Sequence, residues 1–76
     1  MKIYKVSVDD YKEKYFVKEQ KAIEYGLKCL DKAVHREWER KDACETYGVT
    51  SWDEAKKLML DDAEYGIQVE KIEVIE

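Results

Sequence analysis

Histidine, cysteine and glycine are scarce in this chain of 76 residues, which has one, two and three of them, respectively. Two cysteines, Cys29 and Cys44, are too few for a disulfide framework, and we expect both to be free thiols. The glycines, at positions 26, 48 and 66, are isolated, which excludes a glycine-rich phosphate-binding loop. His35 is the single imidazole, so only one histidine is available as the base for nucleophilic catalysis.

Long apolar runs are also missing. None approaches the ~20 residues that a membrane span needs, so no membrane association is expected. The sequence begins with an alternating pattern rather than with the basic and apolar segments of a signal peptide. We therefore expect a cytoplasmic protein, and the length predicts a single small domain over residues 1–76.

Metal binding and catalysis find little support. Cys29, His35 and Cys44 could each ligate a metal, but no two of them form a close pair such as C-x2-C. Cys44 lies beside Asp42 and Glu45, whose negative charges disfavour a reactive thiolate. We expect no catalytic residue, no metal and no cofactor, and hence no enzyme.

What the sequence does contain begins with two segments of alternating pattern. In KIYKVSV, apolar residues at positions 4, 6 and 8 alternate with polar ones, and in YKEKYFV the residues Tyr11, Tyr15 and Val17 share one parity. Both segments read as half-buried strands, with lysines of the second strand on its solvent side. Asp9 and Asp10 suit a turn, so a hairpin is predicted.

The period then changes to that of a helix. Ile23, Leu27, Leu30, Val34 and Trp38 recur at spacings of three and four and would form one stripe. The next positions on that stripe are charged, so the buried face ends near Trp38 and the chain must bend, break or project beyond the sheet. Whether residues 37–47 continue the first helix or form a separate element stays open at this stage.

A second helix and a last strand complete the predicted fold. Gly48 is suited to a helix end, and the segment from Thr50 to Glu54 offers a hydroxyl cap with an acidic residue three positions later. The final segment, IQVEKIEVIE, reads as a strand whose parity slips after Val69, which predicts a bulge or a frayed end. The sequence thus predicts an α+β fold of order β-β-α-α-β, with a three-stranded sheet and two helices packed on one face.

Small residues flank the stripe of the first helix. Ala22, Gly26, Cys29 and Ala33 would let another backbone approach closely, and the second helix is the obvious candidate. The order of the three strands stays open, because the last strand could lie beside the first or follow the second.

Charge is distributed unevenly along the chain. Residues 1–41 carry 11 basic and 8 acidic side chains, a net charge of +3, whereas residues 42–76 carry 3 basic and 10 acidic side chains, a net charge of −7. Such asymmetry can mark an acidic surface that meets a basic partner, although solvated helix faces give similar counts.

Binding to another protein is the function that these patterns favour. Trp38 stands where the apolar stripe ends and is the aromatic residue expected to be exposed, with the charged segment after it as an arm. The candidate protein-binding residues are Glu37, Trp38, Arg40, Lys41, Asp42, Glu45 and Tyr47. A homodimer is a rival interpretation, because a basic first half could meet an acidic second half.

A nucleic-acid or nucleotide-binding module is a second alternative. Lys12, Lys14, Lys18 and Lys21 lie on or beside the second strand, with aromatic residues between them that could stack on bases. The net charge of −4 opposes this alternative, so nucleic acid is not the expected partner.

Within residues 2–25, a predicted hairpin of the form K-[IV]-Y-x-V leads into a helix through E-x-K-A-I-E-Y. With these motifs, the opening of the chain resembles that of small uncharacterised proteins of bacteriophages and mobile elements. The resemblance implies an accessory or counter-defence protein, an inhibitor that acts by binding a host protein in the host cytoplasm. The region from Glu37 to Gly48 departs from the shorter members of this group.

Overall fold

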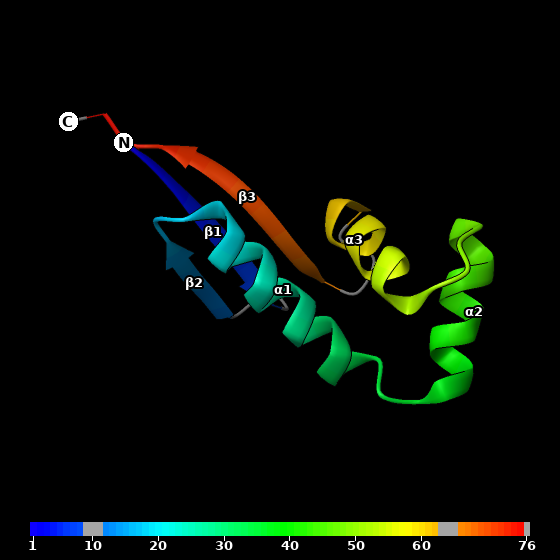
Figure 1. The fold of residues 1–76 in the computed structure, drawn as a ribbon. Helices are drawn as coiled ribbons and strands as arrows, with labels where there is room; N and C mark the ends of the chain where they lie inside the picture. Colours follow the sequence, from blue (N-terminus) through cyan, green and yellow to red (C-terminus); the bar gives the residue numbers. More distant parts are fainter. Residues whose placement is uncertain (9–11, 63–65, 76) are drawn as a thin grey trace.

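The computed structural model describes residues 1–8, 12–62 and 66–75, which form one sheet and three helices (Figure 1). In chain order the elements are β1 (Lys2–Val8), β2 (Lys12–Phe16), α1 (Glu19–Ala33), α2 (Glu37–Tyr47), α3 (Trp52–Asp62) and β3 (Ile67–Glu73). The predicted α+β class is confirmed, and the strands and the two predicted helices follow in the predicted order, with α2 between those helices. The predicted turn at Asp9 and Asp10 lies outside the described residues.

The sheet is antiparallel, with strand order β2-β1-β3. The last strand therefore lies beside the first, which settles the order that the sequence left open. Even-numbered residues of β1 face the helices: Val6 is fully buried and lies opposite Val69 of β3. Odd-numbered residues such as Lys5 lie on the other face, where Lys5 forms ion pairs with Glu13 and Glu70.

The predicted parity of the second strand is wrong. Phe16 pairs with Tyr4 on the helix side, and its ring lies 5.5 Å from that of Tyr25 of α1 in a tilted arrangement. Tyr15 points to the opposite face and is 56% exposed. Lys14 also faces α1, with its ammonium 4.9 Å from the ring of Tyr25. The reason is that β2 is an edge strand without a buried side, so its alternation carries little burial information.

Of the two alternatives for the last strand, the bulge is absent from the described ladder, whereas β3 ends at Glu73, short of the end of the predicted segment, which is compatible with a frayed end. β3 pairs with β1 without interruption from Ile67 to Glu73, and Val74 continues the ladder by donating its N–H to the carbonyl of Met1. The apolar residues of β3 change from odd to even positions because Ile72 lies on the face of the sheet away from the helices, opposite Ile3. Both faces of this strand thus carry apolar residues.

The small residues of α1 admit α3, as predicted. Ala22 and Gly26 are buried, and a Cβ built on Gly26 would lie 2.8 Å from Cδ2 of Leu60 and 3.4 Å from Cγ2 of Val69. The core continues from this contact to Leu30, Met59 and Ile67.

Residues 37–47 form a helix of their own, so the structure has one helix more than the two that were predicted. α1 ends at Ala33, Val34 is buried at the break, and Arg36 has an extended conformation before α2 begins. The break lets Ala43 turn back onto the core, which a continuous helix could not do.

The ends of the last two helices follow the predicted signals. Gly48 has a φ of 67°, the left-handed conformation that glycine adopts at low cost, and its N–H bonds the carbonyl of Glu45. The hydroxyl of Ser51 accepts a hydrogen bond from the N–H of Glu54 at the start of α3.

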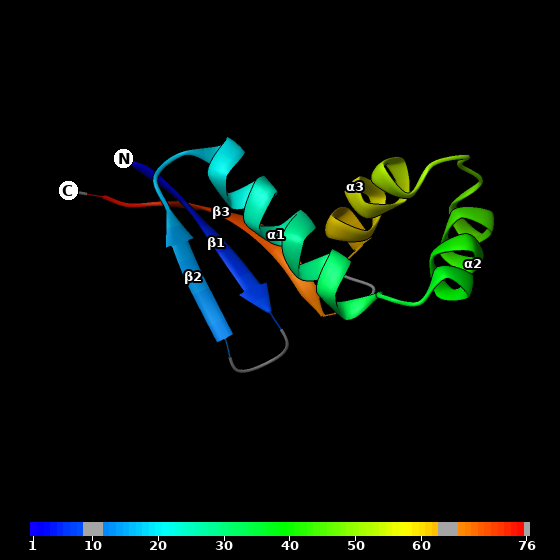
Figure 2. The same cartoon turned by 60° about the horizontal axis from the view of Figure 1, so that its bottom comes forward.

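The molecule is elongated because α2 lies at one end (Figures 1 and 2). Among the described elements, α2 contacts α3 and no strand. The radius of gyration is 13.1 Å, compared with about 11 Å for a compact domain of this length. The two views agree that α2 is the element farthest from β2.

The close contact at Gly26 predicts a sensitive position. Gly26→Val should lower the free energy of unfolding by about 1–3 kcal/mol, because the added methyl groups meet Leu60 and Val69 in a filled space. Lys28→Val, on the exposed side of the same helix, should change it by about 0.5 kcal/mol or less. Urea denaturation of both variants provides the measurement, and equal stabilities would show that α3 does not depend on this contact.

Candidate functional site

The candidate protein-binding residues all lie on α2, and the structure divides them between two faces of the helix. The exposed residues are Glu37, Trp38, Lys41, Asp42 and Glu45. Their spacing of three and four residues after Trp38 places them along one side of the helix, which we call the outer face of α2. Arg40 and Tyr47 lie on the inner side and are half-buried.

Trp38 is exposed, as the sequence predicts. Its side chain is 64% accessible to solvent, a large value for a tryptophan. The predicted apolar stripe therefore loses contact with the core after Val34, one helical turn earlier than the pattern indicates, because the chain turns between α1 and α2.

Arg40 holds α2 against the end of α1. Its Nε donates to the carbonyl oxygen of Val34 at 2.8 Å, and its Nη2 donates to the carbonyl oxygen of Asp31 at 3.3 Å. The last carbonyls of a helix lack partners within the helix, so the guanidinium caps α1 from outside. Arg40 is thereby committed to the fold, although it was predicted to be a binding residue.

Tyr47 also contributes to packing. It lies at the end of α2 and packs against the hydrophobic core near the buried Ala43 and the half-buried Cys44. The outer face of α2 thus consists of Trp38 and its charged neighbours, without Arg40 and Tyr47.

Asp31, near the end of α1, is the centre of a polar cluster that was not predicted. Its Oδ1 accepts a hydrogen bond from the indole Nε1 of Trp52 at 2.8 Å, and its Oδ2 accepts one from Nζ of Lys56 at 2.9 Å. These hydrogen bonds, that from Trp52 first, lower the pKa of Asp31 below its ordinary value of 3.8, and the positive charges of Lys56 and Arg40 add to the effect.

Lys56 is buried although it is a lysine. Its side chain is only 9% exposed, and its ammonium has a second carboxylate partner in Asp53 at 3.4 Å. The ammonium of Lys56 and the guanidinium of Arg40 lie 5.9 and 5.4 Å from the centre of the Trp52 ring, within the range of cation–π attraction. We call Asp31, Arg40, Trp52 and Lys56 the Asp31 cluster.

One signal in the sequence could have revealed this cluster. Lys56 follows Trp52 by four residues and precedes Met59 by three, so it lies on the apolar stripe of its helix. A charged residue at such a position needs a buried counter-ion. Which acidic residue supplies it depends on the packing of α3 against α1, which the sequence pattern does not give.

The possible metal ligands and thiols are not brought together. Cys29 and Cys44 are free and half-buried, whereas His35 is exposed in the connection between α1 and α2. Within the part of the chain that the structure describes, no three histidine, cysteine or carboxylate side chains are placed to hold a metal ion.

The lysines and aromatic rings around the second strand do not share one surface. Phe16 and Lys14 face α1, whereas Tyr15 lies on the opposite face and donates a hydrogen bond to Glu13 at 2.9 Å. Tyr11, which belongs to the same pattern, lies outside the described residues. The described rings are therefore not arranged as a common stacking platform.

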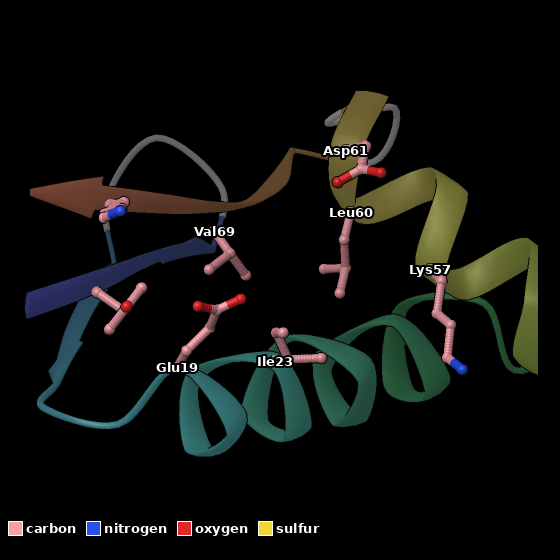
Figure 3. Close-up of a pocket in the computed structure, with 8 residues that line it drawn as sticks. Glu19, Ile23, Lys57, Leu60, Asp61 and Val69 are labelled. Atoms are coloured by element: carbon pink, nitrogen blue, oxygen red, sulfur yellow. The ribbon is translucent and has the colours of Figure 1, made fainter.

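A groove lies between β3 and the helices α1 and α3 (Figure 3). Its volume is about 380 Å³. Ile23, Leu60 and Val69 point into it, as does the carboxylate of Glu19, and further charged residues line it. The lining residues are Tyr4, Glu19, Ile23, Lys57, Leu60, Asp61, Val69 and Lys71.

Comparison with known proteins adds no relative. No protein-family model matches this sequence, and no curated protein or solved structure resembles it significantly. None of the helices in the described ranges is both long and apolar enough to cross a membrane.

The Asp31 cluster predicts a stability effect. Asp31→Asn should lower the free energy of unfolding by about 1–2 kcal/mol, because the buried ammonium of Lys56 loses a charged acceptor while the half-exposed site still admits water. Asp42→Asn is the matched control on α2, and it should change the free energy by about 0.5 kcal/mol or less. Thermal and urea denaturation would test both, and equal effects would contradict the importance of the cluster.

The same residue predicts a dependence on pH. The pKa of Asp31 is lower in the folded state than its ordinary value of 3.8, so its carboxylate stabilises the fold above that value. This contribution is lost as the pH falls through the folded-state pKa. The difference in stability between the wild type and Asp31→Asn should therefore shrink in acid, as urea denaturation at about pH 7, 4 and 2 would measure. A difference that stays constant over this range would contradict the assignment.

Proposed function

We propose that this protein is a non-catalytic module that binds another protein through the outer face of α2, with Trp38 as the anchor. The observation that carries the proposal is the 64% exposure of Trp38 on a helix at the end of the molecule (Figure 1). Tryptophan is among the residues most enriched at the energetic centres of protein interfaces.

Burial of the exposed indole would contribute favourable free energy to binding. Covering the exposed 64% of the residue would contribute at most about 4 kcal/mol, because a tryptophan buries up to about 250 Å² at roughly 25 cal/mol per Å². The indole stands beside Lys41 and Asp42, whose charged groups would surround it as a polar rim.

The attachment of α2 supports its use as a binding element. Arg40 fixes the helix to the carbonyls at the end of α1, and Ala43 packs into the core. The inner face of the helix is thus occupied, whereas the outer face is left to solvent. A helix held in this way presents Trp38 with little loss of conformational freedom on binding.

The charge around Trp38 indicates the chemistry of the partner. Glu37, Asp42 and Glu45 outnumber Lys41 on the outer face of α2, and Asp53 and Glu54 are exposed at the start of the neighbouring α3. The partner that fits this surface has an apolar pocket within a basic region. The resemblance of the N-terminal hairpin and helix implies that the partner is a host protein and that the module acts as an inhibitor in the host cytoplasm.

A homodimer is the second candidate, and the uneven charge favours it. The first 41 residues carry a net charge of +3 and the rest a net charge of −7, so two copies could associate through opposite charges. Such association weakens with salt, and light scattering at low and high ionic strength would detect it.

The proposal predicts the effect of Trp38→Ala. Loss of an anchoring aromatic residue costs about 2 kcal/mol or more, so binding to a partner captured from lysates of candidate bacterial hosts should weaken at least roughly thirtyfold. Tyr15→Ala is the control, because Tyr15 is 56% exposed but lies on the sheet. Quantitative affinity capture followed by titration with the purified partner provides the measurement.

Circular dichroism separates loss of binding from loss of fold. A Trp38→Ala variant that folds normally and binds as well as the wild type would show that the outer face of α2 is not the interface. Equal losses in Trp38→Ala and Tyr15→Ala would contradict the proposal as well.

A further inference from the structure

The outer edge of β3 carries backbone groups that are free to pair. Met1 and Val74 exchange both backbone hydrogen bonds, which fixes the alternation along the β1–β3 ladder. Counting from this pair, the even-numbered residues of β3 bond to β1, and the N–H and C=O groups of Val69, Lys71 and Glu73 point away from it. β3 ends the sheet on this side, and no described residue provides a backbone partner for these groups.

An edge of this kind is a template for another strand. The opposite edge differs, because β2 has five residues and β3 has seven. An added strand at β3 could therefore form a longer ladder than one at β2.

The groove lies on the helix side of the same strand. In Figure 3, Val69, Leu60 and Ile23 converge on it from β3, α3 and α1. A strand added to β3 would direct alternate side chains to this side of the sheet. One of them, opposite Val69, would enter the apolar part of the groove.

The charges around the groove distinguish among the side chains of such a strand. Lys71 lies two residues from Val69 on the same side of β3 and lines the groove. Asp61 lies on α3, toward the other end of the groove (Figure 3). No ion pair between described residues involves Glu19, Lys57, Asp61 or Lys71. An acidic residue would thus complement Lys71, and a basic residue would complement Asp61.

A second copy of this chain fits the edge less well. Two β3 strands could pair antiparallel over their full length, with the helices of both copies on the same face of the joined sheet. Such a pairing is centred on Glu70, the middle residue of the strand. Glu70 would then face Glu70, and Val69 would face Lys71. Like charges in direct opposition destabilise a strand pair.

We propose that the edge of β3 binds an extended segment of another protein by strand addition. The segment runs antiparallel to β3 and has the pattern acidic–x–apolar–x–basic, with the apolar side chain in the groove. Backbone hydrogen bonds to Val69 and Lys71 hold the segment, and the groove with its charged ends selects the sequence. This site is separate from the outer face of α2, and it does not depend on the function proposed for that face.

Synthetic peptides test the proposal directly. The probe is the capped peptide Thr-Glu-Thr-Leu-Thr-Lys-Thr, titrated into ¹⁵N-labelled protein. Saturable shifts and slower hydrogen exchange are expected at the amides of Val69, Lys71 and Glu73. Methylation of the leucine amide nitrogen should weaken binding at least roughly tenfold, because that N–H donates to β3, whereas methylation of a neighbouring threonine nitrogen should have little effect.

Reversing the charges of the peptide and of Lys71 provides a second test. Replacing the glutamate of the peptide by lysine should weaken binding roughly twofold to fivefold, the value of one exposed ion pair, and Lys71→Glu should reverse this preference. Ile23→Lys should abolish binding by filling the groove, with Lys28→Glu on the exposed side of α1 as its control. If Ile23→Lys does not fold, the exposed Lys71→Glu variant still decides the outcome.

Three results would overturn the proposal. The first is the absence of saturable shifts at the β3 amides, and the second is binding that is indifferent to methylation of the leucine nitrogen. The third is protection of the same amides at increasing protein concentration without peptide, which would identify a second copy as the occupant.

Discussion

The carboxylate of Asp31 is the point at which the three helices meet. It accepts hydrogen bonds from Trp52 and Lys56 of α3, and Arg40 of α2 donates to the carbonyls of Asp31 and Val34 at the end of α1. α2 contacts no described strand, so its position depends on this cluster and on its packing against α3. A buried lysine without a carboxylate partner would be costly, and the cluster is therefore a condition for α3 to pack where it does.

The two proposed binding surfaces follow from this arrangement. Since Arg40 and Ala43 turn the inner face of α2 toward the rest of the molecule, Trp38 is left on the outside. Gly26 lets Leu60 approach α1 closely. Next to this contact, α1 and α3 are separated by the groove that Val69 also lines. The packing that stabilises the fold thus also determines which apolar side chains stay accessible.

The sequence predicted part of the candidate site. The loss of the apolar stripe identified Trp38 as an exposed residue, and this prediction needed only the helical period. The hydrogen bonds of Arg40 to the carbonyls of Val34 and Asp31 could not be predicted, because these carbonyls become accessible only where α1 ends. The groove at the β3 edge could not be predicted, since it brings together Ile23, Leu60 and Val69 from three elements that are distant in sequence.

Local patterns determined the elements: the change of period separated strands from helices, and Gly48 and Ser51 marked a helix end and a helix start. These signals act within a few residues, so the sequence alone contains them. Tertiary structure decided which side chains of the second and third strands lie on the helix face of the sheet. Phe16 lies on that face because it pairs with Tyr4, and Ile72 lies on the other face because it pairs with Ile3. Tertiary structure also decided the break after Val34, where capping of α1 by Arg40 and burial of Ala43 favour a turn over a longer helix. Both outcomes depend on contacts between distant residues, whose free energy exceeds the local preference of the segment.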